Sequence, residues 1–223
     1  MNNQVETMEK NLSFSLSKRM YFFIKRLFDI LMSIIGIIAM IPIALIVKIS
    51  YMLTGDFNSI FYKQKRIGKN GEEFNFYKFR SMVPNADEVL KELLKNDKRL
   101  ADEYKINKKL EHDPRVTKMG DILRKTSLDE LPQVICIFKG NMSVIGNRPY
   151  LPREKKDMKE YYADIVKTKP GLTGLWQVSG RSDITFEERL KIEQSYSNEL
   201  SIKLDIKIFF KTFKVVFTHK GAK

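Results

Sequence analysis

The chain has 223 residues, enough for one domain with an appendage and for a hydrophobic core that needs no disulfide or metal to fold. Its 40 lysine and arginine residues exceed its 27 aspartate and glutamate residues and give a net charge of +13. This surplus points to an anionic partner: nucleic acid, phospholipid headgroups or a phosphorylated substrate. A hydrophobic fraction of 43% excludes an intrinsically disordered chain, and the single cysteine excludes an intrachain disulfide framework.

The N-terminal part divides into a polar segment and an apolar one. Residues 1–19 are polar, lack an apolar period and predict a loose tail. Residues 30–47 carry no charge over 18 positions, close to the minimum length for a helix that crosses a bilayer. The run starts too late for a cleavable signal peptide and lacks its small-residue cleavage site. Residues 20–53 are therefore predicted to enter a membrane.

Two features bear on whether this segment crosses the bilayer or turns back within it. Pro42 lies inside the run, removes a backbone hydrogen bond and is expected to break the helix. Basic residues flank both ends, and Asp29 is expected to pair with Arg26 at the membrane edge. The positive-inside rule is satisfied most simply if both ends stay cytoplasmic, as in a re-entrant hairpin, whereas hydropathy alone favours a single crossing.

Residues 54–223 predict a catalytic domain that is α+β and mainly helical. Aromatic and basic residues alternate around a turn at residues 68–71, which is typical of a β-hairpin, and Pro84 opens a helical pattern. Near the C-terminus, Phe209, Phe210 and Phe213 share one helical face and lysines occupy the other. Beside a membrane segment, this pattern favours an interfacial amphipathic helix over an ordinary core helix.

The strongest indication of chemistry is the pair Asp129 and Glu130. The sequence from Ser127 to Glu130 has the form of a capping box, which by itself would give both acids a structural role. The surrounding arginines and lysines change this interpretation, because an ionised carboxylate among cations can ligate Mg²⁺ together with substrate phosphates or attack phosphorus.

Basic and polar residues elsewhere form the candidate phosphate-binding set. They could spread the charge of a pyrophosphate, clamp it from a stiff loop, or line a glycine-rich turn whose N–H groups face an anion. The candidate substrate-binding residues are Lys78, Arg80, Arg115, Arg124, Arg148, Thr173, Gln177 and Arg181.

Several stretches resemble the bacterial sugar transferases, also called monotopic phosphoglycosyltransferases, in their minimal catalytic form. Long motifs that follow one another in order are more specific than a single tetrapeptide. In order, they are residues 25–29 (KRLFD), 64–68 (QKRIG), 78–82 (KFRSM), 113–115 (DPR), 123–133 (LRKTSLDELPQ), 146–149 (GNRP) and 169–181 (KPGLTGLWQVSGR).

The resemblance implies an enzyme that transfers a sugar 1-phosphate from a UDP-sugar to undecaprenyl phosphate, the first membrane step of polysaccharide or glycoconjugate synthesis. Asp129 corresponds to the family's nucleophile, which helps to hold Mg²⁺, expels UMP and forms a sugar-phosphoryl aspartate. Glu130 would position or deprotonate the acceptor. The resemblance also implies a re-entrant helix in the bacterial inner membrane, an active site on its cytoplasmic face, and membrane lipids as further partners.

Three departures from the family pattern are visible. Ile41 stands where a serine usually precedes Pro42, Asn147 replaces a proline and is expected to loosen its loop, and Glu193 replaces an aspartate. Two other functions are compatible with parts of the pattern: a membrane-tethered basic module that binds nucleic acid or anionic lipid, and an inactive scaffold. Neither accounts for an intact acidic pair in a basic region, so nucleic acid is not expected as a partner. The sugar, the glycan pathway and the oligomeric state, including a homodimer, stay open.

Overall fold

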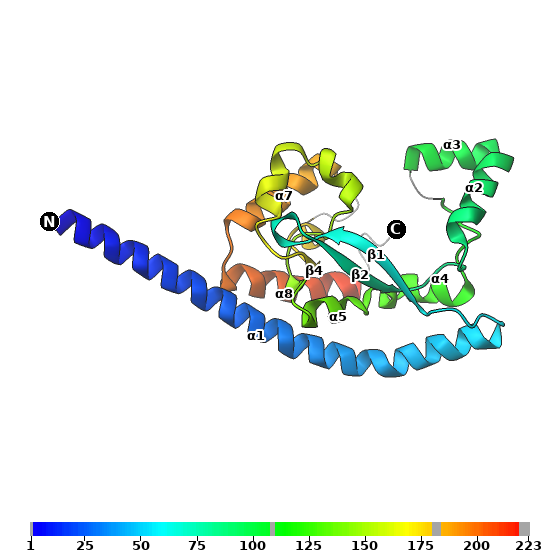
Figure 1. Cartoon of the computed structure of the whole chain (residues 1–223), viewed down its shortest axis with the longest axis horizontal. Helices are drawn as coiled ribbons and strands as arrows, with labels where there is room; N and C mark the ends of the chain where they lie inside the picture. Colours follow the sequence, from blue (N-terminus) through cyan, green and yellow to red (C-terminus); the bar gives the residue numbers. More distant parts are fainter. Residues whose placement is uncertain (1, 108–109, 180–183, 219–223) are drawn as a thin grey trace. The chain divides into compact units, whose positions relative to one another are not determined.

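The computed structural model describes residues 2–107, 110–179 and 184–218, and most of them are helical (Figure 1). The predicted α+β, mainly helical class is confirmed. The α-helices and the strands are α1 (Asn2–Leu53), β1 (Phe61–Ile67), β2 (Glu73–Phe79), α2 (Ala86–Asn96), α3 (Lys98–Asn107), α4 (Lys118–Lys125), α5 (Gln133–Phe138), β3 (Ser143–Ile145), α6 (Tyr162–Ile165), β4 (Gly171–Thr173), α7 (Phe186–Asn198) and α8 (Ile202–Thr218). Five short 3₁₀ turns within these described residues are η1 (Lys69–Gly71), η2 (Leu128–Glu130), η3 (Pro152–Lys156), η4 (Lys159–Tyr161) and η5 (Trp176–Val178).

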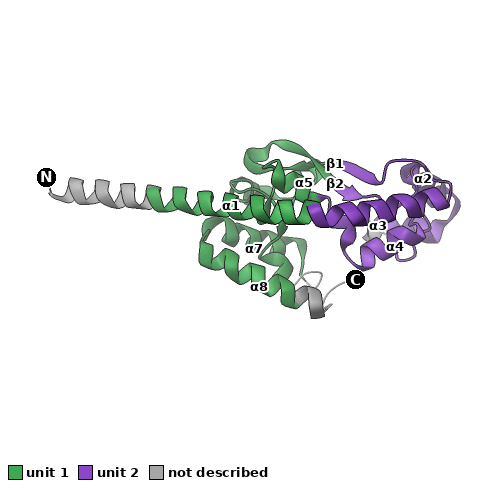
Figure 2. Cartoon of the chain, turned by 90° about the horizontal axis from the view of Figure 1, so that it is seen from below, with its two compact units in different colours: residues 1–37, 64–76, 133–223 green, residues 38–63, 77–132 purple. Residues whose placement is uncertain are grey.

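The chain forms two compact units, coloured separately in Figure 2. Unit 1 contains residues 1–37, 64–76 and 133–223, and unit 2 contains residues 38–63 and 77–132. Helix α1 and the β1–β2 hairpin each contribute to both units. Each unit therefore contains part of the predicted membrane region, residues 20–53, and part of the predicted catalytic domain, residues 54–223.

Helix α1 is longer and more regular than the sequence predicts. It starts at Asn2, so residues 2–19 are helical and do not form a loose tail, and it continues through Pro42 without interruption. Leu16–Leu53 is long and apolar enough to cross a membrane, with a mean hydropathy of 2.9, and only 17% of its most apolar window is buried. Exposed apolar side chains such as Leu31, Ile38 and Leu45 repeat along it. The apolar prediction is confirmed, whereas re-entry into one leaflet is not.

The predicted hairpin and the helices after it are confirmed. The rings of Phe61 and Phe79 stack with centroids 5.5 Å apart, which pairs the start of β1 with the end of β2 in unit 2. Asn70, with φ of 59°, makes the turn between the strands. Helices α2 and α3 follow and lie next to each other (Figure 1).

A second small sheet in unit 1 was not predicted. Strands β3 and β4 pair in parallel, with Ser143 opposite Gly171 and Ile145 opposite Thr173. A β-carbon on Gly171 would lie 2.1 Å from the amide nitrogen of Gly146, so only glycine permits this approach of the two backbones. The glycine-rich segment therefore contains a strand, β4, whose backbone packs closely against β3. Gly146 and Gly171 have a packing role there, and not only the anion-binding role that the sequence suggests.

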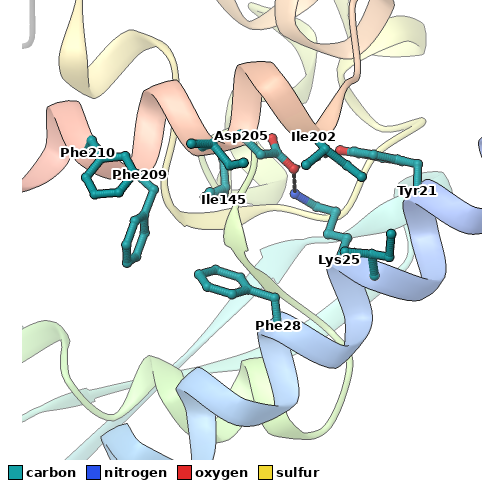
Figure 3. Close-up of a pocket in the computed structure, with 10 residues that line it drawn as sticks. Tyr21, Lys25, Phe28, Ile145, Ile202, Asp205, Phe209 and Phe210 are labelled. Atoms are coloured by element: carbon teal, nitrogen blue, oxygen red, sulfur yellow. Dashed lines mark hydrogen bonds and ion pairs between the residues drawn. The ribbon is translucent and has the colours of Figure 1, made fainter.

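A buried polar cluster joins α1 to α8 in unit 1 (Figure 3). The Lys25 ammonium lies 2.6 Å from the Asp205 carboxylate, which also accepts hydrogen bonds from the hydroxyls of Tyr21 at 3.0 Å and Tyr196 at 2.8 Å. A cavity of about 350 Å³ opens beside it, lined mainly by isoleucine and phenylalanine side chains of α1 and α8. The ion pair and the Tyr21 hydrogen bond connect α1 directly to α8.

Helix α8 has the predicted two-sided character. Ile206 and Phe210 are exposed at 51% and 67%, on a helix that also exposes Lys203, Lys207 and Lys211. The buried side is formed by other residues, including Ile208. The helix therefore leaves both an apolar strip and its lysines uncovered by protein, as an interfacial helix requires.

The expected pair between Arg26 and Asp29 does not form. Arg26 donates hydrogen bonds of 2.8 Å to the backbone oxygens of Ile137 and Phe138, and Asp29 accepts from the amide nitrogen of Val144 at 2.8 Å. The backbone carbonyls at the end of α5 bind Arg26, and the backbone N–H of Val144 on β3 binds Asp29, so backbone groups distant in sequence replace the expected helical ion pair.

Candidate active site

The acidic pair lies on a tight turn of unit 2, directly after α4. Thr117 caps the N-terminus of α4 by accepting from the amide nitrogen of Gly120 at 2.9 Å. After α4, Ser127 adopts the left-handed conformation with φ of 57°, and the 3₁₀ turn η2 carries Asp129 and Glu130. Such a conformation in a residue other than glycine costs about 1 kcal/mol or more and marks a constrained position.

The capping box that the letters of residues 127–130 permit does not form. The Ser127 side chain makes no capping hydrogen bond, and the Glu130 carboxylate accepts from Lys78 on β2 and not from the backbone of Ser127. The left-handed backbone of Ser127 removes the extended geometry that an N-cap residue needs. Both carboxylates of the acidic pair are thereby released from a local structural role.

Lys78 on β2 joins the two carboxylates. Its ammonium nitrogen lies 3.1 Å from Oδ2 of Asp129 and 2.8 Å from Oε1 of Glu130. The side chain of Asp129 is 13% exposed and that of Glu130 is 44% exposed, so the pair opens toward solvent on the glutamate side. The sequence placed Lys78 among the phosphate-binding residues and did not indicate this contact, because 51 residues separate it from Asp129.

Arg80, two residues after Lys78, is bound within unit 2. Its guanidinium lies 2.7 Å from the Asp56 carboxylate, donates to the backbone oxygens of Ser59 at 2.8 Å and Met82 at 3.0 Å, and stacks 4.4 Å from the centre of the Tyr51 ring. Burial would raise the pKa of Asp56, but hydrogen bonds from the side chain and backbone of Asn58, followed by the hydrogen bond and charge of Arg80, hold it below its usual range. Arg80 therefore positions the end of β2 that carries Lys78.

Arg115 and Arg124 differ in whether a ligand can reach their guanidinium groups. Arg115 is buried and binds both oxygens of Asp113, at 2.8 and 2.6 Å. Burial alone would raise the pKa of Asp113, but the hydrogen bonds and charge of Arg115 and the charge of Arg124 lower it. Arg124 is exposed on α4 and donates to Oγ of Ser81 at 2.9 Å. Of the two, Arg124 is the guanidinium that a ligand can reach.

The acidic pair fits an open magnesium site. Mg²⁺ is usually bound through one or two carboxylates, with the other positions taken by substrate phosphates and water. The carboxylates of Asp129 and Glu130 both reach one cationic atom, the Lys78 nitrogen. Among the residues that the structure describes, no group of three or more histidine, cysteine or acidic side chains could form a closed metal site.

Three of the remaining candidate residues, Arg148, Thr173 and Gln177, lie in unit 1. The guanidinium of Arg148 lies 5.7 Å from the centre of the Trp176 ring. Oγ1 of Thr173 is 2.8 Å from Oγ1 of Thr212, and Gln177 donates to the backbone oxygen of Leu172 at 3.3 Å. Arg181 lies outside the described residues. The structure thus groups Lys78, Asp129 and Glu130, and separately groups Arg148 with Trp176.

Asn147 and Glu193, two departures from the family pattern, hold the loop around Arg148, a role that the sequence did not indicate. Glu193 of α7 is 1% exposed and accepts from the backbone nitrogen of Arg148 at 2.8 Å. Asn147, expected to loosen this loop, is 3% exposed and donates to the Ile165 carbonyl and to the hydroxyls of Thr168 and Ser197. The loop around Arg148 is therefore held by the side chains of Asn147 and Glu193, although the sequence predicted a looser loop.

The burial of Glu193 predicts a pH-dependent stability. Burial raises the pKa of Glu193 from 4.5 to about 7, against the lowering effects of the Arg148 amide, the Tyr150 hydroxyl and the charges of Arg148 and Arg189. A raised pKa means that this carboxyl group stabilises the fold most below about pH 4.5, and that the contribution is lost as the pH rises through about 7. At pH 8, Glu193→Gln should therefore exceed wild type in the free energy of unfolding by up to about 3 kcal/mol and unfold at a higher temperature. At pH 5 the two proteins should unfold at nearly the same temperature.

Thermal unfolding of the detergent-solubilised protein at both pH values provides the measurement. Glu188→Gln on the same helix is the matched control. Hydrogen bonds from Thr185 hold the pKa of the exposed Glu188 carboxyl below its usual range, so this variant should gain nothing at pH 8. A Glu193→Gln protein that is less stable than wild type at pH 8 would contradict the assignment.

Comparison with known proteins places this arrangement in a family. Residues 20–219 match the family model described as "Bacterial sugar transferase". The chain is 44% identical over 220 residues to an undecaprenyl-phosphate galactose phosphotransferase of Salmonella typhimurium, which covers 97% of this chain and 45% of that protein. It is 41% identical over 198 residues to the exopolysaccharide production protein ExoY of Sinorhizobium fredii, covering 89% and 87% of the two chains.

A more distant relative is also named for sugar-phosphate transfer to undecaprenyl phosphate. A UDP-glucose:undecaprenyl-phosphate glucose-1-phosphate transferase of Escherichia coli is 31% identical over 207 residues, covering 89% of this chain and 41% of that protein. The chain spans less than half the length of the Salmonella and Escherichia relatives and most of the length of ExoY. The match over residues 20–219 includes the acidic pair, Lys78 and the apolar part of α1, and the chain belongs to the bacterial sugar transferase family.

Proposed function

We propose that the chain transfers a sugar 1-phosphate from a UDP-sugar to undecaprenyl phosphate and releases UMP. The observation that carries the proposal is the convergence of the Asp129 and Glu130 carboxylates on Lys78, within the family match. The relatives named for galactose and glucose transfer support this substrate class.

The first step forms a covalent intermediate on Asp129. A carboxylate oxygen of Asp129 attacks the phosphorus that bears the sugar, and the bond from this phosphorus to the bridging oxygen of the diphosphate breaks. That oxygen leaves with UMP, and the enzyme keeps a sugar-phosphoryl aspartate. Asp129 suits this role because it is the less exposed member of the pair and is held by Lys78.

The second step returns the enzyme to its starting state. An oxygen of undecaprenyl phosphate attacks the same phosphorus, and the bond between phosphorus and the Asp129 oxygen breaks. The products are undecaprenyl diphosphate sugar and the free Asp129 carboxylate. Glu130, which is the more exposed carboxylate, is placed to orient the acceptor or to remove its remaining proton.

The cationic residues of unit 2 balance the charge of the diphosphate. Bound Mg²⁺ would be held by Asp129 and would neutralise phosphate oxygens as charge develops. Lys78 moves from the carboxylates to the phosphate when the substrate enters, and Arg124, exposed in the last turn of α4, binds the diphosphate. Arg80 and Arg115 are positioning residues, since their guanidinium groups are bound by Asp56 and Asp113.

The membrane arrangement follows from the apolar segments. We place residues 20–53 of α1 in the bacterial inner membrane as a re-entrant element that bends at Pro42, with the active site on the cytoplasmic face, because lysines and arginines flank both ends of residues 30–47. Helix α8 lies in the interface with Phe210 and Phe213 toward the lipid, where membrane lipids are further partners.

A direct assay tests this function. Purified protein is incubated with Mg²⁺, undecaprenyl phosphate and, in turn, UDP-galactose, UDP-glucose and UDP-N-acetylgalactosamine, and UMP is measured. We expect UMP release with at least one donor, with loss of activity in EDTA and recovery on adding Mg²⁺. No UMP from any UDP-sugar would favour the non-catalytic basic module instead.

Lys78→Met should change the magnesium requirement in a characteristic way. The Lys78 ammonium occupies the position on which both carboxylates converge, so removing it leaves a more negative site that binds Mg²⁺ more readily. We expect the Mg²⁺ concentration for half-maximal UMP release to fall roughly 5-fold while kcat falls about 10- to 100-fold, because one phosphate ligand is lost. Lys63→Met, an exposed lysine of β1 in the same unit, should change neither value. A higher magnesium requirement in Lys78→Met would contradict the proposed role.

A further inference from the structure

A second cavity of unit 1, of about 210 Å³, has a strongly cationic lining. It lies against the part of α1 that precedes the uncharged run. Its cationic lining residues are Lys25, Arg26, Lys69, Lys167 and Lys169. Asp29 is the carboxylate among the residues that line it, and its Oδ1 already accepts hydrogen bonds from Ser143 and Val144.

Three of these cations have no carboxylate partner in the described part of the chain. Lys25 is paired with Asp205, and Lys167 with Asp164. Arg26 is bound only by backbone oxygens, and Lys69 lies 5.6 Å from the centre of the Phe22 ring. No ion pair of Arg26, Lys69 or Lys169 occurs among the described residues.

The unpaired cations lie close to one another. Nη2 of Arg26 and Nζ of Lys169 are each 3.6 Å from the point where a β-carbon on Gly140 would lie. Burial lowers the pKa of Lys169, and the positive charges of Arg26 and Lys69 lower it further, against the raising effect of Asp29. Like charges gathered in a partly buried cavity repel one another, and a bound anion would relieve that repulsion.

The position of the cavity on α1 selects the kind of anion. Residues 22, 26 and 29 lie on one side of the Tyr21 and Lys25 positions, and residues 24 and 28, which line the apolar cavity of Figure 3, lie on the other. Arg26 comes four residues before the uncharged run at residues 30–47. A basic pocket at the entry of an apolar helix into lipid is at the depth of the headgroups.

We infer that this basic pocket, formed by Arg26, Lys69 and Lys169, binds the phosphate group of an anionic membrane lipid. Its residues all belong to unit 1, and it goes beyond the proposed transfer reaction because its lipid is bound and not consumed. The bound phosphate would tie α1 to the hairpin turn and to the segment before β4, which supply the three cations.

Native mass spectrometry of the full chain in a neutral detergent tests the site. The protein is titrated with dioctanoyl phosphatidylglycerol, with dioctanoyl phosphatidylcholine, whose headgroup has no net charge, and with glycerol phosphate. We expect the first bound phosphatidylglycerol to have at least about 5-fold higher affinity than phosphatidylcholine. Equal affinities for the two lipids would overturn the proposal, as would glycerol phosphate binding as tightly as phosphatidylglycerol.

A pair of matched variants locates the binding. Lys69→Gln with Lys169→Gln should lower phosphatidylglycerol affinity about 10-fold and leave phosphatidylcholine binding unchanged. Arg26 is kept, because it caps the end of α5. Lys155→Gln with Lys156→Gln removes two exposed lysines of unit 1 outside the cavity and should bind as wild type. Equal losses in the two double variants would overturn the assignment to this pocket, and because no turnover is measured, either outcome is independent of the proposed reaction.

Discussion

Asp129→Asn should lower UMP release by at least about 10³-fold, whichever UDP-sugar serves as donor. An amide is a poor nucleophile toward phosphorus, and it also removes the negative charge that would hold Mg²⁺. The side chain is 13% exposed and bonded to Lys78 at 3.1 Å, so asparagine fits the same space and the fold should be preserved. The measurement is the initial rate of UMP release at saturating donor, together with the melting temperature.

Glu130→Gln is the matched control for this loss. It removes the same charge from the neighbouring residue, which also contacts Lys78. If Glu130 serves the acceptor, its variant should lose about 10- to 100-fold in the full reaction and should retain the acceptor-independent release of the first UMP. Equal and complete loss of that first release in both variants would contradict the separate roles.

Gly120→Ala should disrupt unit 2 although it adds a single methyl group. A β-carbon at this position would lie 1.9 Å from the backbone oxygen of Ser81 and 2.5 Å from its carbonyl carbon. Neither atom can move as a flexible side chain would, so α4 must shift away from the end of β2. We expect a loss of about 3 kcal/mol or more in the free energy of unfolding.

The same substitution should reduce catalysis, because it acts on both parts of the acidic site. Gly120 lies on α4, which leads to Asp129, and Ser81 follows the strand that carries Lys78. Lys118→Ala, at an exposed position of the same helix, is the control and should cost less than about 0.5 kcal/mol. The measurements are chemical unfolding in detergent and UMP release below the melting temperature. A Gly120→Ala protein as stable as Lys118→Ala would show that the close contact is not required.

The elements with strong local patterns could be predicted from the sequence. The hairpin at β1 and β2, the helices that start near Pro84, the apolar part of α1 and the two-sided α8 each follow from residue alternation or helical spacing. The family motifs also brought Asp129 and Glu130 forward as the reactive pair.

Features that depend on contacts distant in sequence could not be predicted. The segment from Ser127 to Glu130 has the letters of a capping box, yet Lys78, from another strand, binds Glu130 and the capping geometry is absent. The glycines at 146 and 171 look like a loop and instead allow two short parallel strands to approach. In each case a tertiary contact decided between two local structures that the sequence permits equally.

Partner choice between charged residues was equally hard to predict. Arg26 and Asp29 have the spacing of a helical ion pair, but the carbonyl groups at the end of α5 and the amide of Val144 bind them instead. Unsatisfied backbone groups inside a protein are costly, whereas a pair at the surface of a helix contributes only about 0.5 kcal/mol.

Trapping the covalent intermediate on Asp129 tests the central claim most directly. Purified protein is mixed with a UDP-sugar and Mg²⁺ in the absence of undecaprenyl phosphate, and UMP and the intact protein mass are measured together. We predict release of about one equivalent of UMP per active site, with a mass increase of one sugar phosphate on the peptide that contains Asp129, and neither signal in Asp129→Asn. UMP release that requires undecaprenyl phosphate from the first turnover, with no change in protein mass, would contradict the account.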